Sequence, residues 1–310
     1  MDFGFVVGQA AFVVGMLQSK TSIVLALTAV VFTACRTGEV PLVEVANREV
    51  RDDLGRTVIV SQKIGRAVSL APNLTEMIFA IGAGDRLVGV TTFCDYPAEA
   101  TTKEKVGDTQ TPNVERIIAL RPQIVFVSTA SQLEAFSRTL DEQGIAVYVT
   151  NPTTLEHVFQ NLRHFGELFG RRDAAEELAT SLAARANAVR QMNRERQSKV
   201  RIFIQISNEP LFTIGKDSFL TELLEQAGGT SVTKDVPTGY PKLSKETAAA
   251  LDPDVIILSD SDDNREPNTV FKDSKAVKSG RVYRINPDII SRPGPRLVDA
   301  LEEISRMLES

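Results

Sequence analysis

The residue types that most often do chemistry are scarce in this chain of 310 residues, which contains two histidines, two cysteines and no tryptophan. His157 and His164 are seven residues apart on one predicted helix, a spacing typical of a shared surface or packing face. They are too few for the three-histidine sites that hold zinc in many proteins. The chain also lacks the motifs G-x-G-x-x-G and G-x-x-x-x-G-K-[ST], which bind nucleotide phosphates. We therefore expect no catalytic residue and no metal site, and the chain is predicted not to be an enzyme.

Cys94 is one of the two cysteines and follows the aromatic residue Phe93. A thiol facing a binding site can act as a soft ligand for cobalt or another metal. A lone cysteine is more often a small buried hydrophobic residue, and we favour this interpretation.

Cys35, the other cysteine, follows an uncharged apolar run from Ile23 to Ala34. The run has the length of the hydrophobic region of a signal peptide and is short for a membrane span. Thr33 and Ala34 resemble the small residues of the lipobox, at which bacterial lipoproteins are cleaved and diacylated on the new N-terminal cysteine. We expect residues 1–35 to contain the signal peptide and Cys35 to carry the lipid.

Two alternatives for this N-terminal region stay open. The apolar residues, Phe3 to Val14 included, can form one transmembrane anchor, and synthesis can start at Met16 with Lys20 close behind. Both readings place the rest of the chain outside the cytoplasm. If Cys35 is lipidated, Cys94 has no intramolecular disulfide partner.

The composition indicates a folded globular protein of two domains, with 43% hydrophobic and 24% charged residues. The net charge of −5 argues against a nucleic-acid partner, because phosphate binding needs a surplus of Lys and Arg focused on one face.

The elements that must position any site follow a lobe, helix, lobe order. After Cys35, residues 36–48 are predicted to be a tether, and residues 36–65 to contain this tether and a small hairpin. Residues 66–170 and 200–310 alternate short apolar runs with amphipathic segments, as expected for buried parallel strands and their helices. Residues 171–199 carry a helical apolar stripe, long enough for a helix that bridges two lobes. The predicted fold class is α/β, with two α/β lobes joined by one long helix.

Within this order we predict individual strands and helices from period and turn residues. The predicted strands are Glu49–Asp52, Thr57–Val60, Ala67–Leu70, Leu87–Val90, Ile124–Val127, Ala146–Val149, Val200–Ile206, Val255–Leu258 and Val282–Ile285. The predicted helices are Pro72–Ile81, Asn113–Leu120, Leu133–Gln143, Leu155–Phe169, Asp173–Ser198, Phe219–Ala227 and Arg296–Leu308. Gly228 and Gly229 are expected to cap the helix that precedes them.

Short segments spread over both lobes resemble the class III periplasmic binding proteins of ABC importers, and most closely the vitamin B12 (cobalamin)-binding protein family. The matching segments are Ser69–Glu76, Cys94–Pro97, Asn113–Ile117 with Leu120–Pro122, Phe212–Lys216, Leu243–Glu246 and Arg292–Arg296. The resemblance covers about Arg66 to Leu308 and implies a receptor that captures a corrinoid such as cobalamin between its lobes. The alternative function is that of a binding protein of the same fold whose ligand is a ferric siderophore or haem. A more distant alternative is an enzyme that acts on a tetrapyrrole. No cofactor is expected.

The resemblance also implies which residues line the ligand cleft. Phe93, Phe212 and Tyr240 are expected to pack on a large flat ligand, and Asp288 and Arg292 to hydrogen-bond its amide groups. The remaining candidates are Asn73, Thr109, Gln110 and Ser128. The family has tryptophans in this cleft, whereas Thr109, Ser128 and Tyr240 stand at three such positions here.

In the same family one glutamate per lobe pairs with arginines of the permease. The matching residues are Glu115 and Glu246. Charge-assisted hydrogen bonds from these carboxylates to the permease arginines would fix how the binding protein aligns on the permease. The expected partners are therefore a small-molecule ligand, an ABC permease dimer with its ATPase, and a membrane reached through the lipid anchor. We expect a monomer in the periplasm or at the cell surface.

Overall fold

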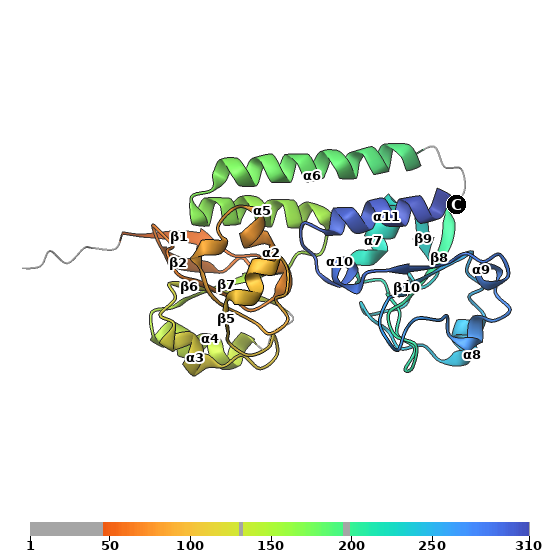
Figure 1. Cartoon of the computed structure of the whole chain (residues 1–310), viewed down its shortest axis with the longest axis horizontal. Helices are drawn as coiled ribbons and strands as arrows, with labels where there is room; N and C mark the ends of the chain where they lie inside the picture. Colours follow the sequence, from red (N-terminus) through yellow and green to blue (C-terminus); the bar gives the residue numbers. More distant parts are fainter. Residues whose placement is uncertain (1–45, 130–132, 195–198, 310) are drawn as a thin grey trace, which may run out of the picture. The chain divides into compact units, whose positions relative to one another are not determined.

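The computed structural model describes residues 46–129, 133–194 and 199–309. Residues 46–310 form one compact unit (Figure 1). The expected signal peptide, the alternative start at Met16, Cys35 and residues 36–45 of the tether lie outside the described residues. None of the helices in the described ranges is long and apolar enough to cross a membrane.

The described chain begins with the predicted hairpin. Strand β1 (Asn47–Arg51) pairs antiparallel with β2 (Thr57–Ser61). The buried carboxylate of Asp52 closes the turn by accepting hydrogen bonds from the backbone amides of Leu54 and Arg56. Because β1 starts at Asn47, the end of the expected 36–48 tether belongs to the hairpin instead.

The N-terminal lobe is a parallel sheet of five strands in the order β5-β4-β3-β6-β7, with helices on both faces. Its strands are β3 (Ala67–Ser69), β4 (Leu87–Val90), β5 (Glu104–Lys105), β6 (Ile124–Ser128) and β7 (Ala146–Thr150). Its helices are α2 (Pro72–Ala80), α3 (Val114–Ala119), α4 (Leu133–Glu142) and α5 (Leu155–Phe169).

The C-terminal lobe is a parallel sheet of four strands in the order β11-β10-β8-β9. Its strands are β8 (Val200–Gln205), β9 (Gly229–Ser231), β10 (Val255–Ser259) and β11 (Val282–Ile285). Its helices are α7 (Phe219–Gln226), α8 (Lys245–Ala249), α9 (Lys275–Lys278), α10 (Pro287–Ser291) and α11 (Leu297–Glu309).

Helix α6 (Arg172–Asn193) joins the two lobes and runs along α5 and α11 (Figure 1). At 1.5 Å per residue its 22 residues span about 33 Å. Gly170, in the left-handed conformation with φ 66°, ends α5 and turns the chain into α6. The two helices approach closely at Gly166, where an added Cβ would lie 2.4 Å from the Cβ of Ala175. The helix begins at Arg172, next to the predicted Asp173, and ends at Asn193, whereas residues 195–198 of the predicted helix lie outside the described residues.

Successive side chains along the central strands point to opposite faces of the sheet and pack in different hydrophobic cores. In β6, Ile124 and Phe126 face a large core that also contains residues of α2, α5, α6, α7 and α11, so it runs through both lobes. Val125 and Val127 face a second core beneath α3 and α4. In the C-terminal lobe, the opposite sheet face packs against α8 and α9 in a third core. The shared core ties the lobes together through the α5, α6 and α11 layer.

Two strands and three short helices differ from the sequence-based expectations. The two-residue strand β5 and the three-residue strand β9 carry no apolar run, and they exist because β4 and β8 offer free edges. Gly228, with φ 90°, does end α7, but Gly229 already begins β9, so the expected two-glycine cap is wrong at Gly229. Helices α8, α9 and α10 have five residues or fewer, too few to show a period.

Candidate ligand-binding site

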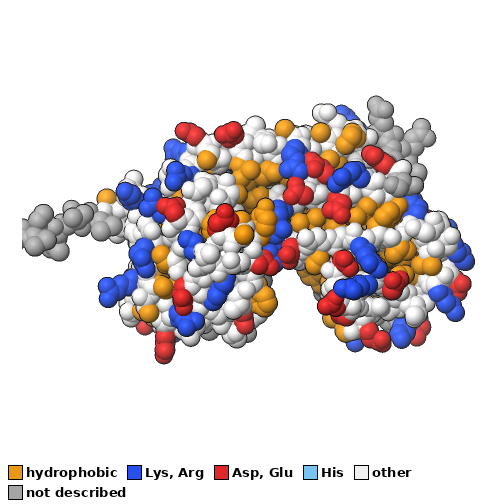
Figure 2. Space-filling view, viewed as in Figure 1, with side chains coloured by type: hydrophobic (Ala, Val, Ile, Leu, Met, Phe, Trp, Pro, Cys, Tyr) orange, Lys and Arg blue, Asp and Glu red, His pale blue; other side chains and the backbone are white. Residues whose placement is uncertain are grey.

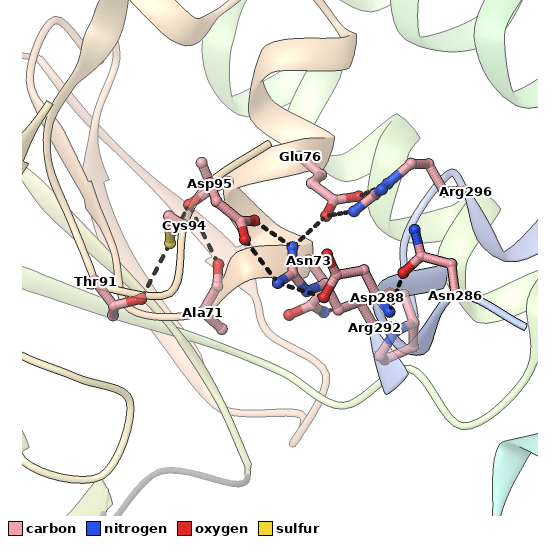
Figure 3. A network of polar contacts seen from close by, with 12 residues as sticks. Ala71, Asn73, Glu76, Thr91, Cys94, Asp95, Asn286, Asp288, Arg292 and Arg296 are labelled. Carbon is pink, nitrogen blue, oxygen red and sulfur yellow. Dashed lines mark hydrogen bonds and ion pairs between the residues drawn. The ribbon is translucent and has the colours of Figure 1, made fainter. Parts of the chain in front are cut away.

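A cluster of charged side chains lies where the loop after β4 and helix α2 meet the segment that follows β11. Parallel strands present their carboxyl ends at one edge of a sheet, which is where open α/β sheets bind ligands. Pro72 starts α2 after Leu70 and Ala71, which follow β3, and Asn286 caps α10 by accepting a hydrogen bond from the amide of Asp288. Figure 3 shows Glu76, Asp95, Asp288, Arg292 and Arg296 pointing toward one another. In Figure 2, acidic and basic side chains gather at the head of a hollow between the lobes.

Arg292 is the centre of this charged cluster. Its Nη1 lies 2.7 Å from Oδ1 of Asp95 and 3.2 Å from Oε1 of Glu76. Its Nη2 lies 2.7 Å from Oδ1 of Asp288. The guanidinium group of this C-terminal-lobe residue therefore contacts two carboxylates of the N-terminal lobe and one carboxylate of the C-terminal lobe.

Arg296 binds the same glutamate from the other side. Its Nε and Nη2 donate to the two carboxylate oxygens of Glu76, the first at 2.9 Å. Its guanidinium carbon also lies 4.0 Å from the centre of the Tyr96 ring, a cation–π contact. Asn73 adds a hydrogen bond from its amide to the carbonyl oxygen of Pro293. These contacts fix residues 292–296 against α2 and the loop after β4.

The ion pairs favour the charged forms of Asp95, Arg292 and Arg296. The hydrogen bond from Arg292 is the largest cause that lowers the pKa of Asp95. Burial alone would lower the pKa of Arg292, but the bonds to Asp95 and the charge of Asp288 raise it. The pKa of Arg296 is raised chiefly by its hydrogen bonds to Glu76.

The predicted aromatic ligand contacts occupy loops of both lobes. Phe93 is exposed on the loop after β4, and Tyr240 is exposed on a loop whose Gly239 accepts a hydrogen bond from the amide of Gly215. Phe212 is half-buried and forms isolated backbone bridges to Ser207 and Lys242.

The remaining ligand candidates lie on other loops of the N-terminal lobe. Thr109 is half-buried and Gln110 exposed in a turn held by the carboxylate of Asp108, which accepts from the amides of Gln110 and Thr111. Ser128 ends β6 and is half-buried. Of the nine predicted ligand residues, the structure brings Asn73, Asp288 and Arg292 together in one contact network.

Sequence reasoning did not select four members of this network, which are Glu76, Asp95, Tyr96 and Arg296. The sequence did contain a clue to these residues, because each lies within a segment that resembles the family. Two of them are acids and one is an arginine, and such residues can form ion pairs. What the sequence could not supply is the pairing itself, since Glu76 and Arg296 are separated by 220 residues.

Cys94 neighbours the cluster but does not belong to it. The residue is buried and free, and its Sγ lies 3.1 Å from the hydroxyl oxygens of both Thr75 and Thr91. The interpretation as a small buried residue is confirmed. His157 and His164 are exposed on α5, and no group of three potential metal ligands forms within the described ranges.

The two glutamates expected to meet a permease occupy equivalent local positions. Glu115 and Glu246 are exposed in the first turns of α3 and α8, whose caps Asn113 and Ser244 accept backbone hydrogen bonds. The backbone amide of Glu246 and the Ser244 hydroxyl lower the pKa of Glu246. Each helix covers the face of its sheet opposite the shared core.

Comparison with known proteins identifies the family. Residues 68–289 match the family model described as periplasmic binding protein. An uncharacterized ABC transporter substrate-binding lipoprotein of Bacillus subtilis, YvrC, is 31% identical over 265 residues, covering 83% of this chain and 84% of YvrC. The vitamin B12-binding protein of Vibrio parahaemolyticus is 31% identical over 263 residues, covering 81% of this chain and 92% of that protein.

A comparison with solved structures identifies the same family. The periplasmic vitamin B12 binding protein BtuF of Vibrio cholerae superposes with a TM-score of 0.72 and 28% identity, over 79% of this chain and 97% of BtuF. The family match spans strands of both sheets and the helix between them. This protein therefore belongs to the periplasmic binding protein family and has the two-lobed, helix-linked fold of its class III members.

Proposed function

We propose that this chain is the substrate-binding protein of an ABC importer and captures a corrinoid such as cobalamin between its two lobes. The observation that carries the proposal is the similarity to the vitamin B12-binding protein of Vibrio parahaemolyticus across both lobes. Asp288 and Arg292, the residues expected to bind ligand amides, lie in the network that joins the lobes.

The exposed aromatic side chains on loops of both lobes suit a large ligand with a flat face, and the exposed carboxylates of the cluster suit a rim of amides. Phe93 and Tyr240 offer aromatic surface from loops of different lobes, and burying apolar area contributes about 25 cal/mol per Å². Carboxylates accept hydrogen bonds from amide N–H groups. Because the chain has no tryptophan, this aromatic contact must come from phenylalanine and tyrosine.

Delivery is proposed to depend on Glu115 and Glu246. Their carboxylates are exposed, and each sits on a short helix at the sheet face away from the shared core. Because both helices pack on rigid sheets, the two charges keep their relative register when they meet arginines of a permease. The shared core through α5, α6 and α11 supports this proposal, since it limits how far the lobes can move.

The anchor is proposed to be a lipid on Cys35, which places the protein on the outer side of a membrane. One of its relatives, YvrC, is named as a lipoprotein. Mass spectrometry of the N-terminal peptide after expression of the full chain tests this directly. A diacylated cysteine at position 35 and its loss in Cys35→Ser support the anchor, and an intact, unmodified N-terminus in the membrane fraction contradicts it.

Isothermal titration of residues 46–310 tests the ligand class. We expect cyanocobalamin to bind one site with a dissociation constant of about 1 μM or tighter. Haem and a ferric siderophore are titrated separately under the same conditions. Saturation by either of these without binding of cyanocobalamin or cobinamide would overturn the corrinoid assignment.

A further inference from the structure

We infer that the charged cluster selects the charge of the ligand, so that the cleft accepts neutral or cationic corrinoids rich in amide donors and disfavours anionic ligands, with Asp95 as a determinant. This inference rests on the proposed function for the location of the ligand. It adds a residue and a selection rule that the proposed function does not contain.

The first observation is the order of exposure within the cluster. The side chains of Arg292 and Arg296 are 13% and 16% exposed, and that of Glu76 is 2% exposed. In contrast, Asp95 is 57% and Asp288 36% exposed. A ligand that enters from solvent therefore meets carboxylates first, while the guanidinium groups lie beneath them.

The second observation is that the arginines are occupied. Both terminal nitrogens of Arg292 contact carboxylates, and Arg296 is bidentate to Glu76 with Tyr96 against its face. An anionic ligand would have to displace one of these carboxylates to reach a guanidinium. The aspartates have remaining capacity, because each carboxylate offers about four acceptor sites and accepts readily from amide N–H groups.

The third observation is the charge balance. Glu76, Asp95 and Asp288 contribute three negative charges, and Arg292 and Arg296 contribute two positive charges. Lys105 is bonded to the same loop, where its ammonium group donates to the carbonyl oxygens of Cys94 and Ala100. The acidic character of the part that faces solvent therefore rests on Asp95 and Asp288, which are more exposed than the two arginines and repel carboxylates on a ligand.

The test compares two pairs of probes that differ in charge and hardly in shape. The first pair is cyanocobalamin and its monocarboxylate, in which one side-chain amide is hydrolysed. The second pair is haem, with two propionates, and its bis-amide. Affinities are measured by isothermal titration at low salt for wild-type residues 46–310, for Asp95→Asn, and for Asp85→Asn. Asp85 is the matched control, because it is an exposed aspartate of the same lobe that pairs with Arg86 outside the cluster.

We expect the amide member of a pair to bind about tenfold more tightly than its carboxylate member. Asp95→Asn should reduce that ratio to about threefold or less, and Asp85→Asn should leave it as in the wild type. Raising the salt concentration should narrow the wild-type ratio, because salt screens the repulsion. Equal affinities within a pair, or a ratio that Asp95→Asn does not change, would overturn the inference.

The two pairs separate this inference from the proposed function. If neither corrinoid binds but the haem pair shows preference for the bis-amide, the corrinoid assignment is wrong and the charge selection stands. If cyanocobalamin and its monocarboxylate bind equally well, the corrinoid assignment stands and the charge selection is wrong. Absence of binding by all four probes refutes both.

Discussion

Replacing Glu76 with glutamine should clearly destabilise the protein, because its carboxylate holds two arginines that are themselves mostly buried. The Glu76 carboxylate is almost fully buried and bonds both Arg292 and Arg296. Its loss leaves Arg296 without a carboxylate partner among the described contacts, whereas Arg292 keeps Asp95 and Asp288.

The expected magnitude follows from these remaining partners. Breaking a buried ion pair by removing one charge costs about 3–5 kcal/mol, because the other charge stays buried without compensation. Glutamine keeps one carbonyl oxygen that can accept from an arginine, and the ring of Tyr96 still covers Arg296. We therefore expect a loss of about 2–3 kcal/mol in the free energy of unfolding.

Urea unfolding of residues 46–310, followed by far-ultraviolet circular dichroism, measures this change. Glu302→Gln is the matched control, because Glu302 binds Arg185 in a bidentate pair that is partly exposed and Arg185 keeps Asp299. The control should lose less than about 1 kcal/mol. Equal losses in the two variants, or a Glu76→Gln protein as stable as wild type, would refute the argument that this glutamate holds buried charges together.

Three further predictions concern delivery, binding and pH. Reversing both Glu115 and Glu246 to arginine should abolish uptake of labelled cyanocobalamin in cells while the affinity measured by titration stays unchanged, and normal uptake would reject the docking role. Tyr240→Ala should weaken cyanocobalamin binding by about 1 kcal/mol or more, and an unchanged affinity would remove Tyr240 from the site. Because Arg292 lowers the pKa of Asp95 below its ordinary 3.8, the ionised Asp95 stabilises the fold above that pH, and this contribution is lost as the pH falls through the lowered value. At about pH 6 the free energy of unfolding of the wild type should therefore exceed that of Asp95→Asn by a small amount, and this difference should disappear in strong acid. A difference that grows on acidification would contradict the pairing.

Much of the fold could be predicted because buried parallel strands and amphipathic helices leave strong patterns. Strands β4 and β11 and helix α5 have the predicted bounds, since each is an apolar or periodic run closed by turn residues. Strands β5 and β9 were missed because their pairing is decided by neighbouring strands and not by their own side chains. Short-range sequence patterns identify strands and helices that have an apolar face of their own. They fail for short strands that form only because they pair with the edge of an existing sheet.

The site was predictable only in part, for a different reason. Asp288 and Arg292 were selected through resemblance to a family, and the structure unites them with Asn73. The pairing of Glu76 with Arg296 depends on the two lobes meeting, a tertiary event that no local pattern encodes. Asp95 and Tyr96 lie in one segment that resembles the family, and their contacts with Arg292 and Arg296 form only once the segment after α10 is in position.

The most direct test of the central claim is native mass spectrometry of residues 46–310 mixed with equimolar cyanocobalamin, haem and a ferric siderophore. A corrinoid receptor should emerge as a complex with one molecule of cyanocobalamin per chain, and this complex should persist when the other two ligands are in excess. A complex that contains haem or the siderophore, with cyanocobalamin left free, would contradict the account.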